Sequence, residues 1–419
     1  MGQFTRWFGH TRGALVLLWA LWLVPRLLFA CLAVTPTSDA DWYVHRAVDL
    51  AAGLGYLDHH GGATAYWPPG WPLTMALLFR AGGVSLAVVA GFNLVCAAMS
   101  AWLMQDLATR IGSALAGRVA LLLIALYPNH IAYVPLAMTE TFYTALLLGG
   151  CWLLVVRSGW GGLALAGVVF GVAMLVKAQT LVVVPLIFAI RLWREGEAWR
   201  RLPMLVAQGA LVVALALLTV SPWTLRNHRE LGAWVMVSTN GGITLLTGNN
   251  DTARGGFTPG DPVVQRLNAR SELNELQFDA EAKRLGVAWI AAHPGRFLML
   301  IPMKLAQLWG PDGDAQWAYE LGWPGWARFA TLGHGLRLLN QGVYGVMLLG
   351  MAAFAVVRLR RRGERLIDWW LLPYGIAAYV SAIAVVFSGQ PRFHFPVMPF
   401  AAMACGWLVA DWLGRRAKP

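Results

Sequence analysis

The sequence has few charged residues and few cysteines. Only 13% of its 419 residues are Asp, Glu, Lys or Arg, whereas soluble domains have about 25%. The four cysteines lie far apart in apolar stretches and form no CxxC pair, which argues against a disulfide framework and against a zinc site. Apolar residues make up 58% of the chain. This composition excludes a soluble globular domain and a disordered chain, and it is typical of a membrane protein.

Apolar runs recur along the whole chain. They cover residues 13–34, 84–104, 119–136, 139–156, 162–176, 179–192, 203–222, 335–357, 367–388 and 395–413. A helix needs about 20 residues to cross a bilayer, so a chain of this length holds about ten spans. The run 13–34 is long for a signal peptide and is interpreted as an uncleaved first span. The predicted fold class is an all-α polytopic membrane protein with periplasmic interfacial helices and a small periplasmic segment.

The net charge of +12 has a clear distribution along the chain. Basic residues flank the inner ends of the predicted spans, from Arg6 near the N-terminus to Lys418 near the C-terminus. Segments assigned to the inner side hold 17 Lys or Arg and 6 Asp or Glu, while segment 223–334 holds ten of each. This is the positive-inside pattern. It places both termini in the cytoplasm and argues against nucleic-acid binding, which requires a basic face on a polar domain.

Two long polar segments lie on the outer side of the predicted topology. The first, 35–83, belongs to a predicted catalytic transmembrane module at 1–222. The second, 223–334, contains Gly-rich turns, a predicted polar helix near Gln265–Ala292 and a short apolar run, Phe297–Trp309. That run contains Pro302 and Lys304 and is too short to cross, so we expect an interfacial or re-entrant helix. Residues 335–419 are predicted to form the C-terminal transmembrane helices.

Charged side chains gather at the outer ends of the predicted spans. They are Asp39, Asp41, Glu140, Lys177, Arg226, Arg392 and His394. Each alone has an ordinary structural interpretation, such as a helix cap, a snorkelling lysine or an interfacial anchor. However, ionisable groups at membrane depth are expensive and usually pair or serve function. Acids and bases that converge on one face therefore predict a site.

The chemistry that suits such a set is transfer from a lipid-linked phosphate. The phosphate lies at the membrane interface and gains charge as it leaves, and Arg and Lys stabilise that charge. An acceptor hydroxyl needs a carboxylate general base within hydrogen-bond reach. The outer acids are therefore candidate bases, and the outer cations are candidate phosphate ligands.

Several motifs, in this order, resemble the C-type membrane glycosyltransferases, which include protein O-mannosyltransferases and the aminoarabinose transferase acting on lipid A. The motifs are Ser38-Asp39-Ala40-Asp41-Trp42-Tyr43, Ala65-Tyr66-Trp67-Pro68-Pro69-Gly70-Trp71-Pro72-Leu73, Met138-Thr139-Glu140-Thr141, Ser221-Pro222-Trp223-Thr224-Leu225-Arg226-Asn227, Ser238-Thr239-Asn240-Gly241-Gly242 leading to Gly248-Asn249-Asn250, and Arg392-Phe393-His394-Phe395-Pro396-Val397-Met398-Pro399. The resemblance covers nearly the whole chain.

The resemblance implies an integral-membrane enzyme that uses a polyprenyl-phosphate sugar with inversion. The family's catalytic acid lies in the first outer loop, four residues before an aromatic, which matches Asp39, with Asp41 as the rival. Glu140 matches a second acidic position, and Arg226 and Arg392 match basic positions near the lipid phosphate. In the aminoarabinose branch a lysine precedes the Pro-Pro pair. Trp67 stands there in this chain, so that contact is absent or supplied elsewhere, with Lys177 as the candidate.

The substrate-lining residues are a further prediction. Tyr66 and Trp67 could stack on a sugar, although an interfacial aromatic belt explains any single tryptophan equally well. Asn240, Asn249 and Asn250 lie in a Gly- and Asn-rich segment. That segment either forms tight turns or lines the sugar site, and the sequence leaves both interpretations open.

The sequence thus predicts a glycosyltransferase of the bacterial inner membrane with a periplasmic active site. The predicted partners are a polyprenyl-phosphate sugar donor, an envelope glycan, lipid or protein acceptor, and membrane lipids. No cofactor is assigned, and a divalent metal is left open. The alternative function is a transporter or flippase of an anionic lipid-linked substrate, which would place charges near the bilayer midplane and show related halves.

Overall fold

The computed structural model describes residues 7–9, 11–157, 159–194, 198–361 and 367–416, so Arg6 and Lys418 lie outside the described residues. The described part of the chain is helical and contains no β-strand. Its helices are α2 (Arg12–Ala30), α3 (Asp39–Ala51), α4 (Gly70–Gly82), α5 (Leu86–Ile111), α6 (Ala114–Ala125), α7 (Pro128–Ala132), α8 (Glu140–Val156), α9 (Trp160–Val176), η1 (Ala178–Val182), α10 (Val183–Arg194), α11 (Ala198–Leu231), α12 (Gly241–Gly248), α13 (Pro262–Asn268), α14 (Glu275–Ala292), α15 (Pro294–Leu308), α16 (Gln316–Gly322), α17 (Trp326–Leu359), η2 (Trp369–Leu371), α18 (Leu372–Val386), η3 (Pro391–Val397) and α19 (Met398–Arg416). The predicted all-α class is confirmed.

Each of the ten predicted apolar runs is largely helical. Among the described residues, six helical segments are long and apolar enough to cross a membrane, or seven if one bent pair counts as a single span. They are Arg12–Ala30, Leu86–Ile111, Arg200–Leu231, Trp326–Leu359, Trp369–Val386 and Pro391–Arg415. Helices α6, α8 and α9 are apolar but shorter. The chain is therefore a multi-pass membrane protein, and the number of ten crossings stays a prediction.

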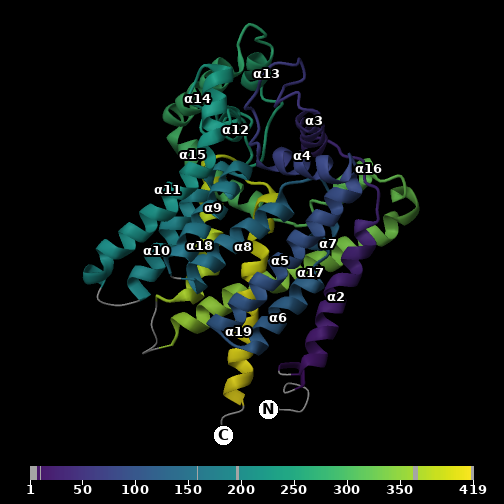
Figure 1. Cartoon of the computed structure of the whole chain (residues 1–419), viewed down its shortest axis with the longest axis vertical. Helices are drawn as coiled ribbons and strands as arrows, with labels where there is room; N and C mark the ends of the chain where they lie inside the picture. The colour runs from purple at the N-terminus through teal and green to yellow at the C-terminus, as the bar shows by residue number, and fades with distance from the viewer. Residues whose placement is uncertain (1–6, 10, 158, 195–197, 362–366, 417–419) are drawn as a thin grey trace.

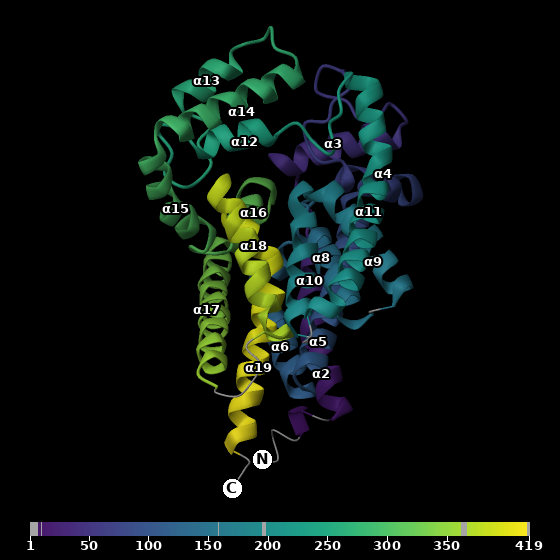
Figure 2. The same ribbon diagram turned by 90° about the vertical axis from the view of Figure 1, so that its left-hand side faces the viewer.

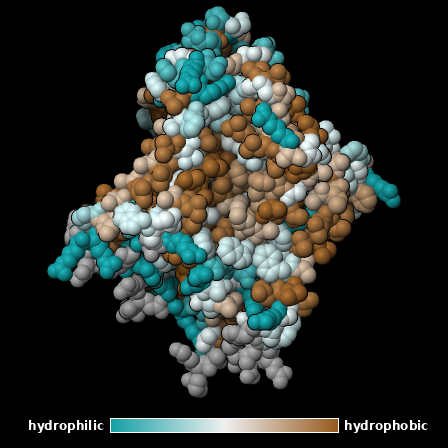
Figure 3. Space-filling view, viewed as in Figure 1, coloured by the Kyte–Doolittle hydropathy of each residue, from teal (hydrophilic) through white to brown (hydrophobic). Residues whose placement is uncertain are grey.

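The two ends of the molecule differ in what they carry. Helix α2 begins and helix α19 ends at one end of the molecule, and α3, α4 and α12–α15 lie at the opposite end (Figures 1 and 2). Hydrophobic side chains dominate the middle of the visible surface, with hydrophilic ones above and below (Figure 3). A surface apolar only around its middle matches a protein surrounded by a bilayer. We call the end that carries α3 and α12–α15 the outer end.

Helix α19 lies at the centre of the bundle. In the membrane-crossing window of the segment Pro391–Arg415, which consists of η3 and α19, 78% of the residues are buried, compared with 22% for α2 and for α17. Small residues allow this central position: a Cβ on Gly406 would lie 2.2 Å from the carbonyl oxygen of Ala116 in α6, so only glycine permits the contact. Trp407 also donates to the carbonyl of Ala108 in α5, at 2.9 Å. Helix α19 is thus fixed to α5 and α6, and it carries η3 at its outer end.

The second outer segment differs from the prediction in detail. The polar helix expected near 265–292 is two helices, α13 and α14, because Asn274 and Gln277 form a capping box that starts a new helix after a turn. Helices α14 and α15 meet at a bend of 106°, with Pro294 at the start of α15. This bent pair agrees with an interfacial or re-entrant element. The expected boundaries at 222 and 335 fall inside α11 and α17, which continue into the outer segment.

Candidate functional site

Asp39 begins helix α3 in the first outer segment. Its neighbour Ser38 has φ 53° and ψ −126° and is the one non-glycine residue of the described chain with a positive φ. Such a conformation costs of order 1–3 kcal/mol, and it persists where the surrounding structure enforces it. It also directs the chain abruptly into α3, so Asp39 lies at the positive end of the helix dipole, which favours a negative charge.

The carboxylate of Asp39 forms an ion pair with Arg392 of η3. Arg392 Nη1 lies 2.6 Å from Asp39 Oδ2, and the side chains of Arg392 and Asp39 are 21% and 19% exposed. The Nε of Arg392 donates to the side chain of Gln390, at 3.0 Å. The two partners are 353 residues apart in the sequence, so the pair joins the first outer segment to the last helix of the bundle.

A second ion pair lies close to the first. Glu140, the first residue of α8, is 2% exposed and lies 3.4 Å from the Nζ of Lys177, at the end of α9. The carboxylate of Glu140 also accepts a hydrogen bond from Thr139, at 3.2 Å. Burial lowers the pKa of Lys177, and the negative charges of Glu140 and Asp39 oppose this effect. Because Glu140 is buried, its charge depends on Lys177 for compensation.

These four side chains form one group, which we call the charge cluster: Asp39, Glu140, Lys177 and Arg392. The Nζ of Lys177 lies 5.5 Å from the ring centre of Phe393, the neighbour of Arg392. Arg392 and Lys177 each act electrostatically on both acids of the cluster. Seven charged residues were predicted from the sequence to converge at the outer end of the bundle, and the structure brings four of them together.

The Pro-Pro-Gly motif of the first outer segment packs next to the charge cluster. A Cβ on Gly70 would lie 2.7 Å from the backbone of Leu175, two residues before Lys177. The indole of Trp71 donates to the carbonyl of Ala137, at 2.9 Å, near the start of α8. The motif therefore brings the first outer segment onto the ends of the two helices that carry Lys177 and Glu140.

Gly70→Ala is expected to destabilise the protein and to lower any activity of the site. The added methyl group must displace the backbone of α9, and overpacking of this kind costs about 1–3 kcal/mol. A lowered thermal unfolding midpoint of the purified protein would show it. Gly91→Ala is the matched control, because a Cβ at Gly91 meets nothing within 4 Å. If both variants unfold at the wild-type temperature, Gly70 does not pack closely against the backbone of α9.

Arg226, predicted near the phosphate, lies in a different setting. Its guanidinium donates to the backbone carbonyls of Thr64, at 2.6 Å, and Tyr56, at 2.8 Å. It also lies over the ring of Trp223, 4.9 Å from the ring centre. Its donors are thus directed to the backbone of the first outer segment. The same strip of backbone is held from the other side by Glu275, which accepts from Ala65 N–H at 2.9 Å.

Arg226→Met is expected to lower stability and to leave lipid-phosphate binding unchanged. Hydrogen bonds made by a charged group contribute about 1.5–3 kcal/mol, so the thermal midpoint should fall by several degrees. The dissociation constant for undecaprenyl phosphate should match that of the wild type. If the variant has the wild-type thermal midpoint but binds the lipid more weakly, Arg226 contacts the phosphate.

Asp41 and His394 also lie apart from the charge cluster. The carboxylate of Asp41 is 53% exposed and lies 3.4 Å from His45, itself 62% exposed. His394 is fully buried, with its two ring nitrogens 2.6 Å from the carbonyl of Leu308 and 3.1 Å from Asp312 Oδ1. In η3, therefore, Arg392 and His394 have different surroundings although only one residue separates them.

The predicted substrate-lining residues divide into two groups. Tyr66 and Trp67 are half-buried and contact each other edge to face, with ring centres 5.5 Å apart. Trp67 also contacts the ring of Tyr43 in α3, with ring centres 6.0 Å apart, so these aromatics lie beside the helix that Asp39 begins. A sugar could stack against such a surface.

The three asparagines have structural contacts. Asn249 donates to the carbonyls of Leu245 and Val386, at 2.8 Å and 3.0 Å, and accepts from Lys304 Nζ, at 2.7 Å. Asn250 is buried and caps the end of α12. Asn240 accepts from the hydroxyl of Ser238, at 3.0 Å. Asn249 and Asn250 thus make backbone contacts, as the tight-turn interpretation of this segment expects.

No metal-binding group is evident in the part of the chain that the structure describes: no three His, Cys, Asp or Glu side chains gather in a way that could hold an ion. In the first outer segment, Asp58 Oδ1 accepts from the backbone N–H groups of His60 and Gly62, both at 2.8 Å. Asp58 thus closes a tight turn in this segment.

Sequence reasoning missed two acids of the second outer segment, Asp312 and Asp314. The segment has no net charge, so its acids did not stand out. The available signal was the short sequence Pro311-Asp312-Gly313-Asp314, which places two acids around a glycine directly after an amphipathic helix. Asp312 is buried against His394, and the charge of Asp314 acts on Arg392 and Glu140 of the charge cluster.

Solved structures share this arrangement of helices. The oligosaccharyltransferase of Archaeoglobus fulgidus, in its apo form, superimposes with a TM-score of 0.56 at 11% identity over 100% of this chain. The same enzyme tethered to an acceptor peptide with the NVT sequon gives 0.52 at 12% identity over 98% of this chain. By sequence, residues 67–224 match the family described as dolichyl-phosphate-mannose-protein mannosyltransferase. The chain has the fold of the C-type membrane glycosyltransferases. This fold was predicted from the motifs, and that prediction is confirmed.

The likeness has defined limits. The chain spans 52% and 50% of the length of the two oligosaccharyltransferase chains, about half of each. ArnT from Cupriavidus metallidurans, bound to undecaprenyl phosphate, gives a TM-score of 0.45 at 16% identity, over 97% of this chain and 79% of that one. No curated protein matches the chain by sequence.

Proposed function

We propose that this protein transfers a monosaccharide from a polyprenyl-phosphate donor to a hydroxyl acceptor on the outer face of the bacterial inner membrane, with inversion at the sugar. The observation that carries the proposal is the charge cluster, in which two acids and two cations from four separate elements meet at the outer end of a membrane bundle. The family match, whose description names a lipid-phosphate sugar donor, supports the same class of chemistry.

Arg392 and Lys177 would hold the phosphate of the donor. When the bond between the sugar C1 and the phosphate oxygen breaks, its electron pair stays on the phosphate, which gains one negative charge. Arg392 offers two parallel hydrogen bonds to a phosphate, and Lys177 offers a compact positive charge. The half-buried position of both cations strengthens their effect, because little water screens them. These interactions grow as the bond breaks, and so they favour the transition state.

Asp39 would act as the general base. The acceptor hydroxyl attacks C1 from the face opposite the phosphate, and its proton passes to a carboxylate oxygen of Asp39. In the structure Asp39 is paired with Arg392. A bound phosphate competes for the same guanidinium and would free a carboxylate oxygen for the acceptor. Donor binding would thus prepare the base, and attack from the opposite face accounts for inversion.

Glu140 would hold Lys177 in place. Its carboxylate is buried and paired with Lys177 at 3.4 Å, so it has less access to an acceptor than Asp39. Tyr66 and Trp67 would provide an aromatic wall for the sugar, beside α3. The acceptor would be an envelope glycan, lipid or protein that reaches the outer face.

Mass spectrometry of the cell envelope tests this proposal and names the substrates. A strain that lacks the gene should lose one glycan modification, and the wild-type chain supplied in trans should restore it. The missing mass identifies the sugar and its acceptor together. Envelopes that stay identical in all glycans under conditions where the protein is made would contradict the proposed function.

A further inference from the structure

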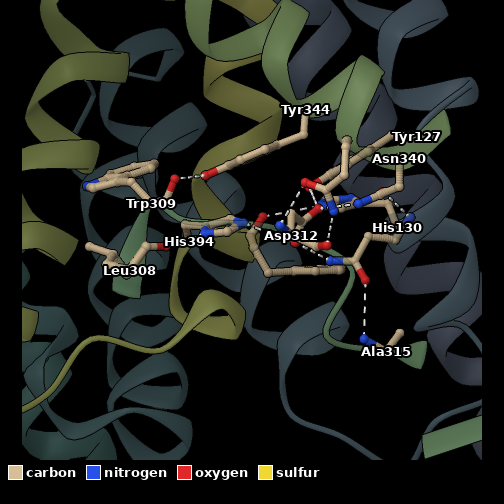
Figure 4. A network of polar contacts seen from close by, with 12 residues as sticks. Tyr127, His130, Leu308, Trp309, Asp312, Ala315, Asn340, Tyr344 and His394 are labelled. Atoms are coloured by element: carbon tan, nitrogen blue, oxygen red, sulfur yellow. Dashed lines mark hydrogen bonds and ion pairs between the residues drawn. The ribbon is translucent and has the colours of Figure 1, made fainter. Parts of the chain in front are cut away.

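A fully buried acid, Asp312, fixes the loop between α15 and α16. Asp312 Oδ1 lies 2.8 Å from Asn129 Nδ2 and 3.1 Å from His394 Nε2, and Oδ2 lies 2.9 Å from Asn340 Nδ2 and also accepts from the hydroxyl of Tyr127 (Figure 4). Burial alone would raise the pKa of Asp312, and its hydrogen bonds, foremost that of His394, hold the pKa below its usual value. Four donors around one carboxylate are what an ionised acid requires.

His394 is the partner of Asp312 in this buried contact. Its Nε2 faces Asp312, and its Nδ1 lies 2.6 Å from the carbonyl of Leu308. Each ring nitrogen of His394 therefore has a hydrogen-bond partner. The ring is stacked between Trp309 and Tyr344, with ring centres 5.8 Å and 4.9 Å away. Both carboxylate oxygens of Asp312 and both ring nitrogens of His394 thus have partners, which makes the buried pair a rigid connection.

This connection joins the segment that carries Arg392 to the segment that carries Asp314. His394 lies two residues after Arg392 in η3, and Asp312 lies two residues before Asp314. Between the two acids Gly313 has φ 103°, a conformation that favours glycine. After Asp314, the buried Ala315 donates its N–H to Asn129, at 3.4 Å. The chain is therefore anchored on both sides of Asp314.

Asp314 differs from the acids of the charge cluster in having no cation of its own. It is half-buried, and in the described part of the chain its carboxylate makes no hydrogen bond or ion pair, whereas Asp39 and Glu140 are each paired. Burial raises the pKa of Asp314. The charged groups that act on it are Arg392, Glu140, Asp312 and His394, and it acts in turn on the hydroxyl of Tyr133.

The balance of charge at the site follows from these positions. Asp39, Glu140 and Asp314 supply three negative charges when ionised, and Lys177 and Arg392 supply two positive ones. A bound phosphate adds at least one further negative charge. Like charges in a half-buried site raise each other's affinity for protons. Asp314 has no ion-pair partner, so its ionised form is stabilised less than those of Asp39 and Glu140.

We propose that Asp314 is a third carboxyl of the site and that it takes up a proton when a lipid phosphate binds to Lys177 and Arg392. The inference rests on the proposed function, since it assumes that phosphate is the ligand. A proton taken up on binding makes affinity depend on pH. Above the pH at which Asp314 ionises in the empty site, the dissociation constant should rise by up to about tenfold per pH unit.

Calorimetry with farnesyl phosphate, a short polyprenyl phosphate, tests the proposal. Titrations in buffers of different ionisation enthalpy give the number of protons taken up. The phosphate itself releases protons when it binds near cations, so the difference between variants is the decisive quantity. The wild type should take up close to one proton more than Asp314→Asn, whose affinity should be higher at alkaline pH and should lack the fall with rising pH that Asp314 causes. Asp314→Ser, which removes the carboxyl with a smaller side chain, should behave in the same way.

Asp279→Asn is the matched control. Asp279 lies in the same outer segment, and burial also raises its pKa, but the charged side chains that act on it are Lys283 and Glu275. It should take up as many protons as the wild type. Equal proton uptake by the wild type and both Asp314 variants would contradict the role of Asp314 and would leave the proposed function unaffected. If no variant binds farnesyl phosphate, the proposed function is overturned, and this inference with it.

Discussion

Asp39→Asn is expected to lower the rate of sugar transfer by a factor of about 10²–10⁴, the range that general acid–base groups contribute. The amide has the shape of the carboxylate but does not accept the proton of the acceptor hydroxyl. Donor binding should persist, because the substitution leaves Arg392 and Lys177 in place and frees Arg392 from its ion pair. The rate is measured on the purified protein with a labelled polyprenyl-phosphate sugar, and farnesyl phosphate affinity is measured beside it.

Asp41→Asn decides between the two acids of the first outer motif. Asp41 is more than half exposed and lies beside His45, so its loss should leave transfer within a few fold of the wild type. Both variants should keep the wild-type thermal midpoint within a few degrees. If Asp41→Asn transfers sugar slowly and Asp39→Asn is fully active, Asp41 and not Asp39 is the general base.

Arg392→Gln should weaken both donor binding and catalysis. It removes the phosphate's bidentate partner and leaves Asp39 without its cation. The loss of one preorganised donor to a developing negative charge costs about 10²–10³ in rate, so kcat/KM should fall by at least that factor. Arg392→Lys should recover part of the loss, because it restores the charge but not the two parallel hydrogen bonds.

Arg226→Met is the natural comparison for Arg392→Gln. Both arginines are half-buried at the outer end of the bundle, but Arg226 donates to backbone carbonyls of the first outer segment. Arg226→Met should therefore lose stability, and Arg392→Gln should lose affinity and rate. Wild-type binding of farnesyl phosphate by Arg392→Gln would contradict its place at the phosphate.

The sequence was sufficient to predict where the charge cluster lies. Topology put Asp39, Glu140, Lys177 and Arg392 at the same end of the membrane, because the positive-inside pattern fixes which end of each span faces outward. Ion pairing at membrane depth is a strong requirement, so residues brought to one face are expected to find each other. The fold class followed from the same apolar runs.

The sequence could not separate anchoring residues from site residues within one motif. Arg226 and Arg392 both follow or precede a span, and only the fold shows that carbonyls of the first outer segment take the donors of Arg226. His394 lies two residues from Arg392, and its burial depends on Trp309, Tyr344 and Asp312, which come from distant segments. Such long-range packing leaves no periodic pattern in a short motif.

The decisive measurement follows the fate of the donor in proteoliposomes that contain the purified protein and a radiolabelled undecaprenyl-phosphate monosaccharide, the sugar being the one that envelope mass spectrometry names. Free undecaprenyl phosphate should form in equal amount to the glycosylated acceptor, with the anomeric configuration inverted, and Asp39→Asn should slow the formation of both products by the same factor of about 10²–10⁴. Movement of the intact donor across the bilayer without cleavage would contradict the account and indicate a flippase instead.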